Sequence, residues 1–108
     1  MSGPYRSATL RKLAEKAPVC MSCGTQNEGQ VVMAHWRSLA WGAGMGQKPH
    51  DLPAYLCDYC HDLVDRRRGE MPREDREAMW TAACARSVLW LLQEGHLLPT
   101  YLPGVKDE

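Results

Sequence analysis

Four of the five cysteines stand in two pairs, and each pair has the Cys-x-x-Cys spacing that lets both thiolates reach one metal ion. Cys20 pairs with Cys23 and Cys57 with Cys60, and 33 residues separate the two pairs. In a reducing compartment, such pairs are typical of a zinc site rather than of a disulfide framework. The sequence therefore predicts that all four thiolates bind one structural zinc ion.

Two histidines stand where a second kind of chemistry is possible. His61 directly follows the second cysteine pair, and Asp65 comes four residues later. In a helix over residues 58 to 67 these two side chains would share one face, because residues i and i+4 do so. His35 ends the apolar run 31 to 34, where an imidazole more often packs at the edge of a core than acts as a base. The pattern alone leaves both interpretations of His35 open.

Local signals predict the elements that must position these residues. A three-and-four spacing of leucine and alanine predicts a helix over residues 7 to 17, which Ser7 can cap and Pro18 ends. Residues 30 to 36 are typical of a strand, and residues 54 to 56 of a short second strand that could return antiparallel to it. The second strand would lead the chain directly into the second cysteine pair.

The remaining elements are a loop and a long helix. The glycine-rich segment 41 to 53, closed by proline, predicts a functional loop without helix or strand. The longest helix is predicted from about residue 72 to 94, with Pro72 in its first turn and Gly95 as its stop. Cys84 is expected to be a buried free thiol on the apolar stripe of this helix. That stripe is predicted to consist of Trp80, Cys84, Val88 and Leu91.

Length, composition and net charge limit the class of protein that this chain can be. With 108 residues, 44% of them hydrophobic and 24% charged, the chain is expected to form one domain over residues 1–108, whose small core a metal would help to stabilise. The net charge of +0 means that any binding of nucleic acid must be local, through clusters such as the basic residues between positions 6 and 16. The first residues carry no apolar signal-peptide core, and no window is apolar enough to span a membrane. We therefore expect a cytoplasmic protein that does not bind membranes.

The order of these parts indicates a fold class. A strand ending in a histidine, a loop, a short strand, a cysteine pair and a helix carrying a histidine follow one another as in the ββα-metal hairpin. In that hairpin the strand histidine activates water and helix residues hold a divalent cation. We expect an α+β protein with a zinc-stapled ββα-metal (HNH) core over residues 18 to 69, an N-terminal helix and a long C-terminal helix.

Three stretches carry a more specific pattern: Ala-His-Trp-Arg at 34 to 37, Gly-Met-Gly-Gln-Lys-Pro-His-Asp-Leu at 44 to 52, and Cys-Asp-Tyr-Cys-His-Asp-Leu-Val-Asp-Arg-Arg at 57 to 67. Together they resemble the small phage and prophage nucleases of the YbcO-like family, within the HNH superfamily. The resemblance implies a metal-dependent DNA endonuclease of phage origin. It also implies that His35 is the general base, that His61 binds the catalytic cation, and that Asp51 stands near the place of the asparagine that orients the base.

The sequence departs from this pattern at Ala34. Many HNH proteins carry an acidic or histidine metal ligand directly before the base histidine, and alanine cannot coordinate a cation. The second protein ligand is then expected to be Asp65, which shares a helix face with His61, or else His50 from the loop. One imidazole with hard oxygen ligands suits Mg²⁺ or Mn²⁺ as the catalytic cation.

The implied reaction is phosphodiester hydrolysis. The strand histidine takes a proton from water as the water attacks phosphorus, and the cation stabilises the charge on the leaving oxygen. Several basic side chains are expected to bind the phosphates of the DNA: Arg37, Lys48, Arg66, Arg67 and Arg68.

Two other interpretations fit the same residues. The first is a non-enzymatic zinc-knuckle module that binds nucleic acid or a protein partner, with both histidines packed against the knuckles. The second is a degenerate nuclease that still binds DNA. A run of three arginines is also common at a solvated helix end, where the helix dipole favours positive charge.

Overall fold

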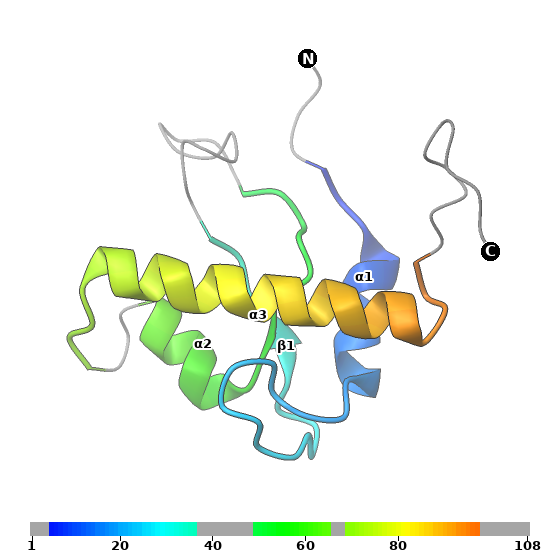
Figure 1. Cartoon of the computed structure of the whole chain (residues 1–108), viewed down its shortest axis with the longest axis horizontal. Coiled ribbons are helices and arrows are strands. Elements are labelled where there is room, and N and C mark those ends of the chain that lie inside the picture. Colours follow the sequence, from blue (N-terminus) through cyan, green and yellow to red (C-terminus); the bar gives the residue numbers. More distant parts are fainter. Residues whose placement is uncertain (1–4, 37–48, 66–68, 98–108) are drawn as a thin grey trace.

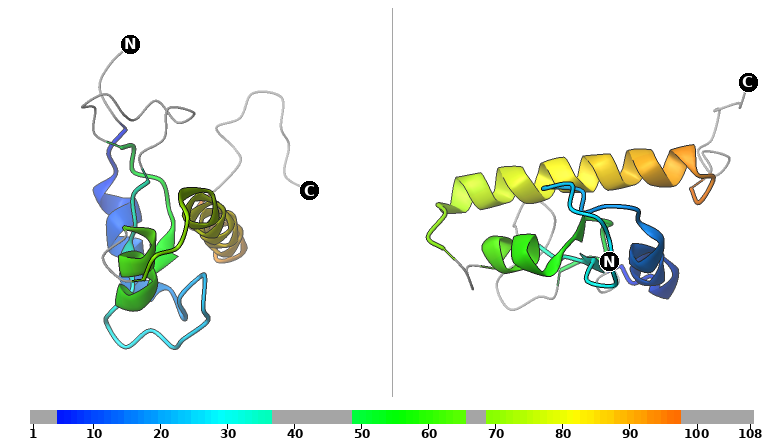
Figure 2. Two further views of the ribbon diagram at one scale, coloured as in Figure 1. Left: turned by 90° about the vertical axis from the view of Figure 1, so that its left-hand side faces the viewer. Right: turned by 90° about the horizontal axis from the view of Figure 1, so that it is seen from below.

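The computed structural model describes residues 5–36, 49–65 and 69–97, which form two layers (Figure 1). One layer is the long helix α3 (Arg73–Gln93). The other layer contains, in chain order, α1 (Ala8–Leu13), the 3₁₀ helix η1 (Ala14–Lys16), β1 (Val32–Met33), β2 (Tyr55–Leu56) and α2 (Asp58–Val64). Two further views show α3 lying along one face of that layer (Figure 2). Among the described residues, no helix is both long and apolar enough to cross a membrane.

The N-terminal helix forms where the sequence predicts it, although its last turn is tighter than an α-helix. Ser7 caps α1, and its hydroxyl accepts a hydrogen bond from the Leu10 amide at 3.1 Å. The last turn, η1, ends shortly before Pro18. The side-chain amide of Asn27 closes this end, since it lies 3.2, 3.3 and 2.7 Å from the carbonyl oxygens of Ala14, Glu15 and Ala17.

The two strands form a short antiparallel sheet, with Val32 opposite Leu56 and Met33 opposite Tyr55. One further hydrogen bond, from the Ala34 amide to the Ala54 carbonyl at 2.8 Å, extends the pairing. The predicted strand over residues 30 to 36 is therefore too long. β2 lies between Pro53, which has no amide hydrogen, and Cys57, where the chain turns into α2, so it offers little backbone for pairing.

The helix α2 begins at the second cysteine pair. Cys57 is its N-cap residue, and the Cys57 sulfur accepts a hydrogen bond from the Cys60 amide at 3.5 Å. The sequence predicts a helix over residues 58 to 67, whereas α2 ends at Val64 with Asp65 as its C-cap residue. The remainder of the predicted span lies outside the described residues.

The long helix α3 confirms its predicted bounds to within one residue. Pro72 is its N-cap residue, and Glu74 and Asp75 place negative charge at the positive end of the helix dipole. Gly95 follows the C-terminus with a φ of 77°, a left-handed conformation that glycine adopts without a steric penalty. The helix therefore begins and ends at the residues that the sequence signals indicate.

The face of α3 that packs on the other layer differs from the predicted stripe. Cys84 and Val88, expected on this face, lie beside it and are only partly buried, and burial raises the pKa of the Cys84 thiol. The small side chains of Ala83 and Ser87 take their place, which lets the helix backbone come close to β2. The buried residues of α3 are Arg76, Trp80, Ala83, Ser87 and Leu91.

Ser87 joins the two layers through a buried hydrogen bond, and its removal is our first prediction. Its hydroxyl accepts the buried Tyr55 amide of β2 at 3.1 Å and donates to the Ala83 carbonyl at 2.8 Å. Ser87→Ala should lower the free energy of unfolding by about 1–3 kcal/mol, because the buried amide loses its acceptor. Urea unfolding measures this, with the exposed Thr81→Ala on the same helix as control. Unchanged midpoints for both variants would contradict the prediction.

Candidate metal centre and active site

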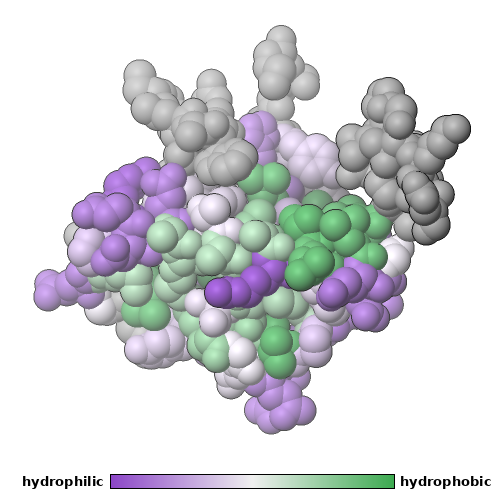
Figure 3. Space-filling view, in the orientation of Figure 1, coloured by the Kyte–Doolittle hydropathy of each residue, from purple (hydrophilic) through white to green (hydrophobic). Residues whose placement is uncertain are grey.

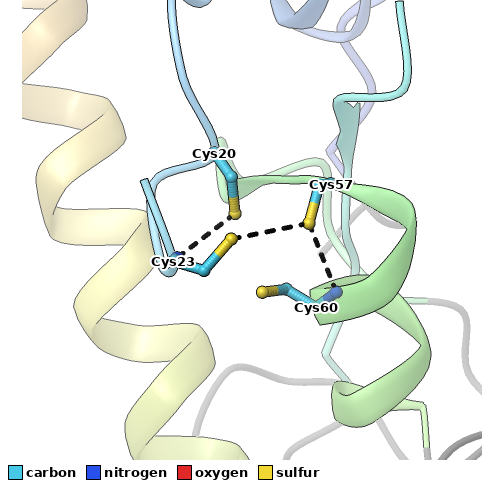
Figure 4. A group of neighbouring side chains, drawn as sticks. All are labelled: Cys20, Cys23, Cys57 and Cys60. Carbon is cyan, nitrogen blue, oxygen red and sulfur yellow. Dashed lines mark hydrogen bonds between the residues drawn. The ribbon is translucent and has the colours of Figure 1, made fainter. Parts of the chain in front are cut away.

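The four cysteines of the two predicted knuckles converge at one place (Figure 4). Cys20 and Cys23 come from the segment before β1, and Cys57 and Cys60 from the start of α2. Their sulfur atoms all lie within 4.8 Å of one another, and those of Cys23 and Cys57 are 3.8 Å apart. A tetrahedral site with Zn–S bonds of about 2.3 Å needs sulfur atoms about 3.8 Å apart. The cluster is therefore suited to hold a metal ion such as zinc.

Backbone amides of the first knuckle donate to a sulfur atom. The amides of Ser22 and Cys23 lie 3.4 and 3.5 Å from the Cys20 sulfur. Gly24 adopts a φ of 79°, and its amide donates to the Cys20 carbonyl at 3.0 Å, which closes a tight turn. Amide donors stabilise a negatively charged sulfur. The local backbone therefore favours the thiolate, the form that binds metals.

The thiol pKa values show why the cluster favours a cation. Burial raises the pKa of Cys60, and the charge of the neighbouring Cys20 raises it further. Burial also raises the pKa of Cys57. At Cys20 burial opposes ionisation as well, but hydrogen bonds from backbone amides outweigh it and lower the pKa to about 7. Several thiolates in contact repel one another, and a bound dication removes that repulsion.

His35 and Asp51 form a second cluster. His35 follows β1, and its Nε2 lies 2.8 Å from Oδ1 of Asp51. The histidine side chain is 34% exposed, whereas the aspartate side chain is fully buried. Because a carboxylate only accepts hydrogen bonds, Nε2 carries the ring proton and the lone pair of the neutral ring is on Nδ1. Trp80 holds the strand just before this histidine by donating its indole N–H to the Ala34 carbonyl at 3.0 Å.

Asp51 also binds the N-terminal segment. Its Oδ2 accepts the Ser7 amide at 2.8 Å, and its Oδ1 accepts Nη1 of Arg6 at 3.1 Å. Nη1 of Arg11 lies 3.6 Å from Oδ2. Burial alone would raise the pKa of Asp51, but the His35 hydrogen bond, the Ser7 amide and the charge of Arg11 outweigh burial and lower the pKa below its usual value. Asp51 is therefore a carboxylate at neutral pH.

A cleft of about 640 Å³ contains His35 and Asp51 in its lining. Asp65 from the end of α2 lines the same cleft, as does the indole of Trp36. Four arginines also line it, two from the N-terminal segment and two from α3: Arg6, Arg11, Arg73 and Arg76. The cleft thus brings a histidine, two carboxylates and several guanidinium groups into one depression.

Two of the basic side chains at this cleft, Arg6 and Arg11, belong to the basic cluster between positions 6 and 16, whereas the two from α3 are not expected there from the sequence. The basic cluster near the N-terminus is visible in the sequence, but Arg6 contacts a residue 45 positions away, and no local pattern indicates that contact. Arg73 and Arg76 lie in α3, and the whole of α2 separates them in the chain from His35. The residues expected to bind phosphates lie outside the described residues: Arg37, Lys48, Arg66, Arg67 and Arg68.

The three expected ligands of a catalytic cation are His61, Asp65 and His50, and they have different contacts. His61 and Asp65 lie together on α2, with 3.3 Å between Nε2 and Oδ2. The Nδ1 atom of His50 accepts the Tyr5 amide at 2.8 Å, so Nε2 of the neutral ring carries the proton and neither nitrogen offers a lone pair. Within the described part of the chain, the cysteine cluster is the one group of three or more histidine, cysteine or acidic side chains close enough to hold a metal. Of the three expected ligands, His61 and Asp65 therefore contact each other, whereas His50 contacts the N-terminal segment.

These features define a small mixed α/β protein with a cysteine cluster fit for a metal ion and a separate cleft with a histidine and an aspartate. The family model described as "Putative nuclease YbcO" matches residues 8–96, and the chain belongs to this family. Searches of curated proteins and of solved structures found no match. The matched span contains both cysteine pairs and every residue that lines the cleft except Arg6.

The second prediction concerns metal content. Cys57→Ser should release the metal and unfold or aggregate the chain, because metal binding at such a site is coupled to folding and Cys57 also caps α2. Cys84→Ser is the matched control, since Cys84 is a thiol outside the cluster. Elemental analysis should find one zinc per chain in the wild type and in the control. A metal-free wild type that keeps a cooperative thermal transition would contradict the assignment.

Proposed function

We propose that this protein is an HNH-type, metal-dependent endonuclease of phage origin that hydrolyses phosphodiester bonds in DNA. The observation that carries the proposal is the 2.8 Å contact between His35 and Asp51 in a cleft lined by arginines. Membership of a family described as a nuclease supports the same class of reaction. The chain order also agrees with a ββα-metal core, since His35 follows β1, Asp51 precedes β2 and His61 lies in α2.

In this proposal His35 is the general base. Asp51 accepts a hydrogen bond from the protonated Nε2 of His35. The Nδ1 atom of His35 is then the one that takes a proton from water as the water attacks phosphorus. The buried carboxylate fixes the orientation of the ring and stabilises the imidazolium that forms. Ala34, directly before the base, is 0% exposed, so its side chain faces the core and adds no ligand to the cleft.

His61 and Asp65 are the proposed ligands of Mg²⁺ or Mn²⁺. Bound there, the cation would neutralise charge on the scissile phosphate and on the leaving oxygen. Asp65 connects the two parts of the site, because it contacts His61 and also lines the cleft that contains His35. A carboxylate, an imidazole, water and phosphate oxygens suit Mg²⁺, which commonly keeps several waters. Cys60, a ligand of the proposed zinc, directly precedes His61 and fixes its backbone.

The third prediction tests the base. His35→Ala should reduce nicking of plasmid DNA by about two to four orders of magnitude, the usual effect of losing a positioned general base. Zinc content and melting temperature should stay nearly unchanged, because the side chain is partly exposed. Asp51→Asn is a second variant, which keeps an acceptor for Nε2 but removes the charge, and a smaller loss is expected. A His35→Ala protein that loses fold and activity together would indicate a purely structural histidine.

The fourth prediction tests the cation. His61→Ala should keep the structural zinc and lose cleavage that depends on Mg²⁺ or Mn²⁺. Asp65→Ala should raise the Mn²⁺ concentration for half-maximal rate more than it lowers the rate at saturating Mn²⁺, because one of few protein ligands is removed. Titration of Mn²⁺ against nicking rate measures both effects.

His50→Ala is the matched comparison for the metal titration. Since its Nδ1 accepts the Tyr5 amide, it should titrate like the wild type. A shift in this variant, with an unchanged Asp65→Ala, would place the second ligand in the loop instead. A wild-type protein that binds DNA but cleaves none at any metal concentration would contradict the proposal and favour the non-enzymatic module or the degenerate nuclease.

A further inference from the structure

The lining of the cleft carries more positive than negative charge, although the whole chain has no net charge. The formal net charge of the chain is +0, yet four arginines and only two carboxylates line the cleft. Figure 3 shows hydrophilic side chains gathered over the first turns of α3, where two of these arginines lie, and hydrophobic ones over its C-terminal half. A cleft lined mainly by one sign of charge attracts ligands of the opposite sign. The ligand that suits this cleft is therefore an anion.

Two of the four arginines are held by backbone carbonyl groups. Arg76 is 7% exposed, and it donates from Nε to the Met71 carbonyl at 3.2 Å and from Nη1 to the Val64 carbonyl at 3.0 Å. Arg6 donates from Nη1 to the Pro49 carbonyl at 2.7 Å and also to Asp51. These two side chains fix the walls of the cleft, because Arg6 joins the N-terminal segment to Pro49 and Asp51, and Arg76 joins α3 to the end of α2.

The other two arginines are placed to contact a ligand. The Arg11 side chain is 49% exposed, and its Nη1 lies 3.6 Å from Asp51, a distance of ionic attraction rather than of a hydrogen bond. The guanidinium carbon of Arg73 lies 4.9 Å from the centre of the Trp36 ring. Stacking on an indole uses the flat face of a guanidinium, and the N–H groups of a guanidinium lie in its plane. Both arginines suit bidentate contact with phosphate oxygens.

Each of these two arginines is linked to His35, the proposed base, through one intervening residue. Asp51 contacts His35 and attracts Arg11, and Trp36 follows His35 in the chain and lies beneath Arg73. The two arginines come from α1 and α3, and Figure 1 places α1 and the first turns of α3 on opposite sides of β1. An extended polyanion crossing the cleft past the histidine would thus meet a guanidinium on each side.

We propose that Arg11 and Arg73 bind backbone phosphates of the nucleic acid on the two sides of the bond to be cleaved. The identity of the ligand rests on the proposed nuclease function, whereas the anion site itself rests on the cleft. The two arginines are substrate-binding residues that set the register of the backbone relative to Nδ1 of His35. They read no sequence, because phosphate contacts position a nucleic acid without identifying its bases.

The fifth prediction tests this site by binding rather than by cleavage. Binding of a fluorescent DNA duplex is measured by anisotropy over a series of salt concentrations, in zinc-loaded protein carrying His35→Ala and without added Mg²⁺ or Mn²⁺. Arg11→Gln and Arg73→Gln should each weaken binding and reduce the slope of log K against log salt by about 0.9, one phosphate contact. Arg11→Lys and Arg73→Lys should keep the slope, since they keep the charge. Lys12→Gln is the control, because Lys12 is exposed next to Arg11 and does not line the cleft.

The outcomes separate this inference from the nuclease assignment. Reduced slopes for both glutamine variants support the site, even if the wild type proves unable to cleave DNA. Slopes equal to that of the Lys12→Gln control would overturn it, even if the wild type cleaves. Single-stranded DNA and RNA of the same sequence serve as further probes, and a smaller loss of about 0.7 per arginine is expected on single strands. A loss confined to one of these probes would contradict contact through phosphate alone.

Discussion

The cysteine cluster is the constraint on which the rest of the fold depends. The sheet consists of two strands of two residues each, and an isolated two-stranded hairpin is marginally stable in water. One cysteine of the cluster, Cys57, is also the N-cap of α2 and follows β2 directly. A metal ion at this place would therefore join the first knuckle, the sheet and the helix that carries His61.

A single buried carboxylate organises the cleft in a similar way. Asp51 is the common partner of the His35 ring, of the Ser7 amide at the start of α1, and of two arginines of the N-terminal segment. Burying an ion is costly unless it is paired and hydrogen-bonded, and these contacts supply both requirements. The same contacts that make Asp51 tolerable inside the protein also orient the histidine and hold the arginines at the cleft.

Sequence reasoning succeeded where the cause is local. The cap at Ser7, the stop at Gly95 and the spacing of the cysteine pairs each depend on neighbouring residues, and each predicted what the structure shows. The prediction of the buried face of α3 was wrong at Cys84 and Val88, because an apolar pattern cannot reveal that Ser87 is buried and accepts an amide of β2. The sequence placed Arg11 in a basic cluster but not next to Asp51, since only the folded chain brings α1 to that residue.

The spread of the cleft along the chain has a consequence for protein synthesis. Its lining begins with Arg6, passes through the loop at Asp51 and ends with Arg76, whose guanidinium holds the end of α2. A nascent chain that has emerged only as far as α2 already possesses all four cysteines, but it lacks one wall of the cleft. Metal capture can thus precede assembly of the cleft during translation. The cleft itself is complete only after α3 has docked and brought Arg73 and Arg76 to it.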